Sequence, residues 1–216
     1  MKIIRSAVGV LTLGAGFGAA LSLVKDVSSP GGMIGRRSVD AGWVWVEKAA
    51  EMVSLLLDVG WAWAALAVAV GWLVGGLIRG AGAGVLALIA ATAAYYCGES
   101  AFTGVPLAWQ WRLMLSWWLA SVLFGPILGA VGASIGRPGV IGLLARLTVP
   151  VGAIVEMTFL PPQIFLIGRP TASWALVIVW TAAAASIGAI LIRFLAAVRR
   201  RDLGINTQKS QAQRMR

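Results

Sequence analysis

Six long apolar stretches divide the chain, and polar or charged residues lie between them. The stretches cover residues 3–24, 59–78, 81–98, 111–135, 139–160 and 173–198. Each has roughly the 20 residues that an α-helix needs to cross a hydrocarbon core of about 30 Å. The pattern therefore predicts an all-α fold, a polytopic transmembrane bundle of six helices.

One further segment, residues 43–58, has a different pattern. Its polar residues follow one another largely in steps of three and four, which places them on one helical face: Glu47, Lys48, Glu51, Ser54 and Asp58. Three ionised groups within five residues argue against a passage through hydrocarbon. We therefore expect an amphipathic helix that lies in the outer membrane interface, with its carboxylates in water.

The connections between the stretches are marked by helix-breaking residues. Residues 25–40 are expected to form a loop, because they contain serines, a proline and three glycines. A very short turn at Arg79 and Gly80 would join the second and third spans as a tight hairpin, and Pro161 and Pro162 would end the fifth. Residues 202–216 are polar without an apolar face, which is typical of a disordered tail. The sequence thus predicts one transmembrane domain, residues 1–201, and a disordered cytoplasmic tail, residues 202–216.

The first stretch has two interpretations. Lys2 and Arg5 precede an apolar run, as in a signal peptide. The run is longer than the usual apolar core of such a peptide, and the rest of the chain is membranous too. We favour a retained first helix over a cleaved one.

Basic residues are distributed unevenly between the two sides that six spans define. Both termini fall on one side, together with 12 of the 18 Lys and Arg residues and, of the 8 acidic residues, only Asp202. Cytoplasmic loops carry an excess of Lys and Arg. The count predicts a multi-pass protein of the plasma membrane with its N-terminus and C-terminus in the cytoplasm.

Composition agrees with a membrane location and narrows the chemistry. Hydrophobic residues make up 59% and charged residues 12%, with a mean hydropathy of +0.87; a soluble domain carries about 25% charged residues. The net charge of +10 is concentrated at helix ends and in the tail, which favours anionic lipid heads over nucleic acid as the partner. The chain has no histidine and one cysteine, Cys97, so we expect no enzyme, no cofactor and no metal site.

A candidate polar cluster is formed by Glu99, Gln110, Arg112 and Glu156. In the six-span topology all four lie in the outer half of the bundle. Glu156 lies about 7–8 Å below the outer end of its span at 1.5 Å per residue, where a carboxylate is costly unless it is paired. We expect Arg112 to pair with Glu99 or Glu156, either as a structural ion pair or as an outward-facing site for a charged solute.

Small residues and prolines mark the helices in two ways. Glycines recur four apart as Gly14 and Gly18, Gly71 and Gly75, Gly125 and Gly129, and Gly132 and Gly136. Such pairs allow close helix packing, inside the bundle or in a homo-oligomer or membrane protein partner. Pro126 and Pro150 lie in the middle of the fourth and fifth spans, where each is expected to kink its helix.

Four short Gly- and Ala-rich motifs carry a family resemblance. They are Gly60-Trp61 with Ala64-Ala65-Leu66, Ala93-Ala94-Tyr95-Tyr96, Phe124-Gly125-Pro126-Ile127-Leu128-Gly129, and Gly136-Arg137-Pro138-Gly139. With these motifs about half of the chain resembles an uncharacterised family of small multi-helix integral membrane proteins from actinobacteria. The resemblance implies a membrane location and a helical bundle, and no activity.

Two functions follow from these expectations. The first is a small-solute carrier or the substrate-binding membrane subunit of a transporter, for which the outer polar cluster would be the site. The alternative is a non-transporting membrane partner or assembly subunit held by the glycine-rich faces. A solvent-connected outer cavity that reaches the polar cluster would favour the carrier.

Overall fold

The computed structural model describes the backbone of residues 2–29, 31–160 and 170–214, and the side chains of residues 7–29, 31–37, 40–160 and 171–200. Throughout this part the secondary structure is α-helical, which confirms the predicted all-α fold. Its helices are α1 (Lys2–Ser28), α2 (Met33–Asp40), α3 (Val44–Leu57), α4 (Gly60–Val74), α5 (Leu77–Thr103), α6 (Leu107–Ser134), α7 (Val140–Phe159) and α8 (Pro170–Arg214).

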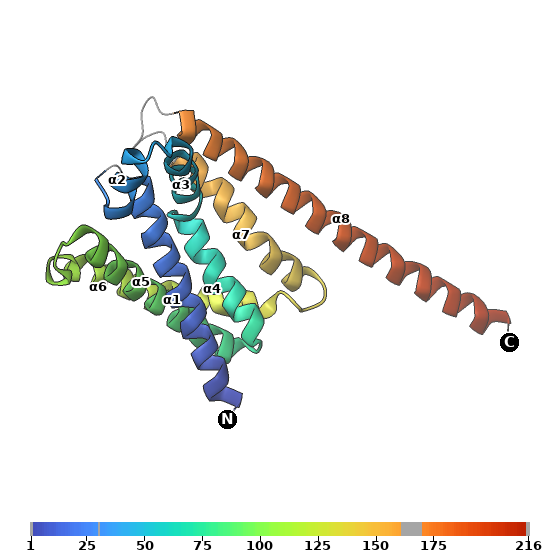
Figure 1. Cartoon of the computed structure of the whole chain (residues 1–216). Coiled ribbons are helices and arrows are strands. Elements are labelled where there is room, and N and C mark those ends of the chain that lie inside the picture. The colour runs from blue at the N-terminus through green and yellow to red at the C-terminus, as the bar shows by residue number, and fades with distance from the viewer. Residues whose placement is uncertain (1, 30, 161–169, 215–216) are drawn as a thin grey trace.

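Five of these helices are long and apolar enough to cross a membrane: α1 from Ala7 onward, α5, α6, α7 and α8. A sixth passage is formed only if α3 and α4 count together, because they are bent by 67° at a short break. The protein is therefore a multi-pass integral membrane protein. Figure 1 shows that both ends of the chain lie toward the same end of the bundle.

Helix α3 coincides with the predicted amphipathic segment to within one residue at each end. It begins at Val44 and ends at Leu57, and none of its residues is fully buried. It packs mainly against α1, with smaller contacts to α8 and α2, and it lies at the end of the bundle where α1 ends (Figure 1). Its position in the membrane interface stays a prediction.

The loop expected over residues 25–40 is wrong in both halves. Helix α1 continues to Ser28, and α2 forms from Met33 to Asp40. The Asp26 carboxylate accepts hydrogen bonds from the backbone N–H groups of Met33 (2.9 Å) and Ile34 (2.8 Å). Those groups have no partner within a helix, so the distant carboxylate stabilises the start of α2 in place of a local capping residue.

The expected turn at Arg79 and Gly80 is also displaced. The chain turns at Gly75 and Gly76, which have φ angles of 67° and 74°, and α5 begins directly afterwards at Leu77. Only glycine adopts such angles without strain. Gly80 instead lies within α5 and faces Gly129 and Ala133 of α6.

The last helix is longer than expected, whereas the expected end of the fifth span is not described. The proposed end of the fifth span at Pro161 and Pro162 lies outside the described residues. Helix α8 continues to Arg214, so a helix occupies most of the region that we expected to be a disordered tail. Pro126 and Pro150 lie inside α6 and α7, which continue as helices through both.

Glycines allow the helices of the bundle to pack closely. A Cβ atom on Gly14 or Gly18 of α1 would collide with the backbone of Ala87 or Ala91 of α5. The backbone of a neighbouring helix blocks a Cβ in the same way at Gly71, Gly125, Gly129 and Gly132. Six of the eight glycines that we singled out therefore serve packing within the chain; Gly75 and Gly136 do not.

Candidate functional site

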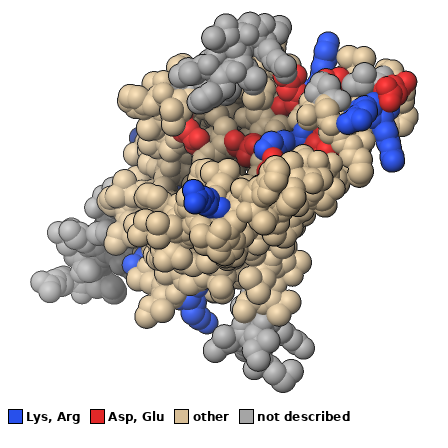
Figure 2. Space-filling model, turned by 90° about the vertical axis from the view of Figure 1, so that its left-hand side faces the viewer, with Lys and Arg blue, Asp and Glu red and all other residues tan. Residues whose placement is uncertain are grey.

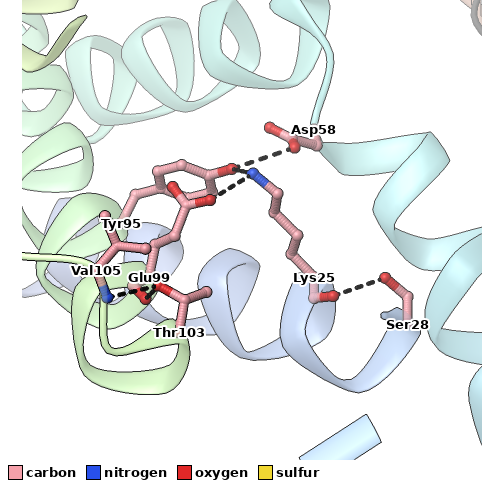
Figure 3. A network of polar contacts seen from close by, with 7 residues as sticks. All are labelled: Lys25, Ser28, Asp58, Tyr95, Glu99, Thr103 and Val105. Atoms are coloured by element: carbon pink, nitrogen blue, oxygen red, sulfur yellow. Dashed lines mark hydrogen bonds and ion pairs between the residues drawn. The ribbon is translucent and has the colours of Figure 1, made fainter. Parts of the chain in front are cut away.

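A hydrogen-bonded network joins α1, α5 and the break between α3 and α4 (Figure 3). The Lys25 ammonium donates to Glu99 Oε1 (2.9 Å) and to the Tyr95 hydroxyl (2.7 Å). The Tyr95 hydroxyl in turn donates to Asp58 Oδ2 at 3.4 Å. One cation thus contacts one carboxylate directly and reaches a second one through a phenol.

The register between α1 and α5 brings these groups together. Gly14 faces Ala87 and Gly18 faces Ala91, so the two helices run in the same direction and stay in step. One turn further along, Ser22 lies against Gly98. Lys25 then projects toward Tyr95 and Glu99, which are four residues apart and share one face of α5.

Aromatic packing fixes the orientation of the Tyr95 ring. Trp63 of α4 and Tyr96 of α5 meet the ring edge to face, with centroids 6.1 Å and 5.3 Å away. Phe17 of α1 packs against Trp63 in the same manner. These contacts hold the phenol where its hydroxyl reaches both Lys25 and Asp58.

Asp58 forms no ion pair of its own with any described residue. It follows the last residue of α3 and precedes the start of α4. In the described part of the chain the ion pair within 4 Å is Lys25–Glu99. The lysine charge is therefore shared between two carboxylates, directly with Glu99 and through the Tyr95 hydroxyl with Asp58.

Glu156 has a structural partner at the same end of the bundle. Its carboxylate accepts hydrogen bonds from the backbone N–H groups of Gly60 (2.7 Å) and Trp61 (2.6 Å). These are the first residues of α4, where the helix dipole favours a negative charge. Glu156 of α7 therefore caps α4 and locks the two helices together.

The expected ion pair of Arg112 with Glu99 or Glu156 is wrong. Arg112 is exposed on α6 and forms no ion pair with any described residue. Gln110, two residues earlier, has its Oε1 atom buried without a hydrogen-bond donor among the described residues. Of the four candidate residues, only Glu99 belongs to the network, because Lys25 lies nearer to Glu99 than any arginine does.

Three network residues were missed at the sequence level. Tyr95 belonged to a quoted motif but received no role, and Asp58 was assigned to a water-facing stripe. Lys25 was treated as a loop residue. The glycine spacing of α1 was the available signal, since Gly14, Gly18 and Lys25 lie on the same face of a helix.

Two cavities border the network. A polar one of about 670 Å³ lies between the ends of α1 and α5 and helix α2, with Lys25, Asp26, Arg36 and Glu99 in its wall. On the face drawn in Figure 2 the acidic side chains lie in the upper part, around a hollow, whereas basic side chains occur above and below. This cavity reaches Glu99 but not Arg112 or Glu156.

The second cavity, of about 470 Å³, lies between α4, α5 and α6 and is mostly apolar. Its aromatic lining residues are Trp63, Tyr95, Tyr96, Trp117 and Phe124. Asp58, Thr92 and Ser121 also line this cavity. The network thus has a polar cavity on one side, at Lys25 and Glu99, and an aromatic cavity on the other, at Asp58 and Tyr95.

The arrangement suits the recognition of an amphiphile. Aromatic faces attract cations through their quadrupole, and a carboxylate without a basic partner does so by its charge. Among the described residues no group of His, Cys, Asp and Glu could hold a metal ion.

Comparisons with protein-family models, curated proteins and solved structures found no match for this chain. The resemblance to small actinobacterial membrane proteins therefore stays an expectation.

Proposed function

We propose that the protein is a carrier, or the substrate-binding membrane subunit of a transporter, for small amphiphilic cations. The observation that supports this proposal is the aromatic cavity with Asp58 in its lining, a carboxylate that forms no ion pair within 4 Å with any residue that the structure describes. The apolar body of a solute would fill the space between Trp63, Tyr96 and Trp117. Its positive charge would lie at Asp58 and against the aromatic faces.

The Lys25–Glu99 pair would separate the two cavities in the resting protein. Lys25 and Glu99 border the polar cavity, and Tyr95 and Asp58 border the aromatic one. A cation arriving at Asp58 would repel Lys25 and strengthen its contact with Glu99. The proposal thus links occupation of the aromatic cavity to the state of the network.

A pair of ions with the same shape and opposite charge provides the test. Purified protein would be titrated with tetraphenylphosphonium and with tetraphenylborate, with quenching of tryptophan fluorescence as the readout. We expect the cation to bind at least about tenfold more tightly, since a single favourable charge contact of about 1.4 kcal/mol gives that factor. Asp58→Asn should abolish most of this preference.

The matched control is Glu47→Gln, which removes one negative charge from α3 without altering either cavity lining. It should leave the preference unchanged. Equal binding of both ions to the unmodified protein, or an unaltered preference in Asp58→Asn, would contradict the carrier proposal. Uptake of tetraphenylphosphonium into proteoliposomes would then separate transport from binding.

Helix α8 favours the second candidate, a membrane partner or assembly subunit. Only 17% of the most apolar stretch of α8 is buried within the chain, against 39% of the corresponding stretch of α5. Its contacts within the bundle are chiefly with α7 and, less extensively, with α3. A partner helix could pack along the exposed remainder of α8. This role would be supported if a second membrane protein co-purified with the chain and if substitution of exposed residues of α8 abolished that co-purification.

We further propose that both termini face the cytoplasm and that the membrane is the plasma membrane. The uneven distribution of the basic residues supports this orientation. The seven acidic side chains that the structure describes come from the C-terminal parts of α1, α2, α5 and α7, from α3, and from the connection between α3 and α4, as the proposal requires.

A further inference from the structure

Three arginines meet at the end of the bundle opposite α2. Arg137 lies in the connection between α6 and α7, Arg146 lies on α7, and Arg193 lies on α8. They line a cavity of about 230 Å³, and Phe194, Ala197 and Val198 of α8 form its apolar wall. No part of the proposed cation site is involved.

The chain directs these arginines toward one another. Gly139 has a φ of 78° and provides the sharp turn into α7. Arg146, about two turns into that helix, donates a hydrogen bond from its Nε to the backbone oxygen of Ile135 at 3.1 Å. The guanidinium is thereby drawn back to the connection, while its two Nη groups have no acceptor among the described residues.

Among the residues whose side chains the structure describes, none brings a negative charge to this cavity. No acidic residue lines it. The described carboxylates belong to the other end of the bundle, where Asp26 and Glu156 are already occupied by backbone N–H groups. Three guanidiniums of like charge in one small cavity repel each other unless an anion lies between them.

The chemistry of the cavity defines the anion. Guanidinium groups match the geometry of phosphate oxygens and bind them through paired hydrogen bonds. The apolar wall on α8 adjoins the exposed side chains of Ile192 and Leu195 on the same helix, which are 69% and 65% exposed. A free ion would not use that apolar surface, whereas the glycerol and acyl part of a lipid would.

We infer that this cavity binds the phosphate of one anionic phospholipid, with the lipid chains running along α8. Helix α8 extends beyond α7 away from the bundle (Figure 1). A lipid at this position would fill the space between α7 and α8 and connect the two helices. The site would lie at headgroup depth, on the side with the excess of basic residues.

Native mass spectrometry of the full chain in detergent provides the test, with short-chain phosphatidylglycerol and phosphatidylcholine as probes. We expect one tightly bound phosphatidylglycerol per chain and no comparable binding of phosphatidylcholine. The double variant Arg146→Gln/Arg193→Gln should bind phosphatidylglycerol at least about tenfold more weakly, because charge-assisted hydrogen bonds are lost. Arg137→Gln, in an exposed connection, tests the same site if the double variant does not fold.

Arg112→Gln is the matched control for Arg137→Gln, because it removes one positive charge at the other end of the bundle, and it should leave binding unchanged. If the double variant and Arg137→Gln both bound phosphatidylglycerol as tightly as the unmodified chain does, the inference would be overturned. An equal loss in Arg112→Gln would overturn it too, since binding would then depend on overall charge. Displacement of the lipid by an equal concentration of inorganic phosphate would show a free-anion site and refute the lipid assignment.

Discussion

Lys25 is the central residue of the polar network, although the sequence did not suggest a role for it. It forms the ion pair with Glu99 and fixes Tyr95 in the same contact. Its side chain is 43% exposed and that of Glu99 is 22% exposed, so solvent screens the pair in part. The contribution of this pair to stability is therefore smaller than that of a fully buried one.

We predict that removing the Lys25 cation destabilises the protein. Lys25→Met should lower the free energy of unfolding by about 1 kcal/mol, because Glu99 is left half-buried without a cation. Adding Glu99→Gln should recover part of that loss. The control Lys48→Met, on exposed α3, should change stability by less than about 0.5 kcal/mol.

Thermal unfolding in detergent, followed by tryptophan fluorescence, measures these differences. If Lys25→Met were as stable as the unmodified chain, the ion pair would contribute nothing. If the double variant were less stable than Lys25→Met, the two side chains would act independently.

Helix boundaries show why the elements were only partly predictable. Hydropathy identifies apolar helices well, and five predicted spans correspond to α1, α5, α6, α7 and α8. Hydropathy does not mark a turn between two apolar helices, so the turn was predicted at Arg79 and Gly80 although it lies at Gly75 and Gly76. It also missed α2, whose first turn depends on Asp26, a residue in the preceding helix.

The close packing of α1 against α5 depends on the glycines of α1. Gly18→Ala should destabilise the protein by about 1–3 kcal/mol, because the new Cβ meets the backbone of Ala91 and α1 has to move away from α5. Gly16→Ala is the matched control, since nothing lies within 4 Å of its new Cβ. It should be neutral or slightly stabilising. Both variants are compared by thermal unfolding, and equal stability would mean that α1 and α5 do not depend on this close approach.

The polar network could not be derived from sequence for a related reason. Glu99 was recognised as costly to bury, but its partner was sought on α6. Which cation reaches Glu99 depends on the register between α1 and α5, and that register is set by Gly14 and Gly18 packing on Ala87 and Ala91. A small change in this register would give Glu99 a different neighbour.

For the whole molecule, the uneven charge predicts its orientation. In a Cys97→Ser background, Arg36→Cys should react with a membrane-impermeant maleimide added to intact cells. Gln208→Cys should react only after the membrane is permeabilised, because the C-terminus is expected in the cytoplasm. Labelling of Gln208→Cys in intact cells, with protection of Arg36→Cys, would reverse the proposed topology.

Helix α4 has a consequence for the surrounding bilayer. It begins at Gly60 and ends at Val74, so at 1.5 Å per residue it is about 22 Å long, against a hydrocarbon core of about 30 Å. Such a mismatch thins the neighbouring lipid leaflet or lets water reach below the headgroups. Because Asp58 directly precedes this short helix, we predict that, where α4 forms the apolar part of the sixth passage, the dielectric barrier against a charged solute is lowest beside it.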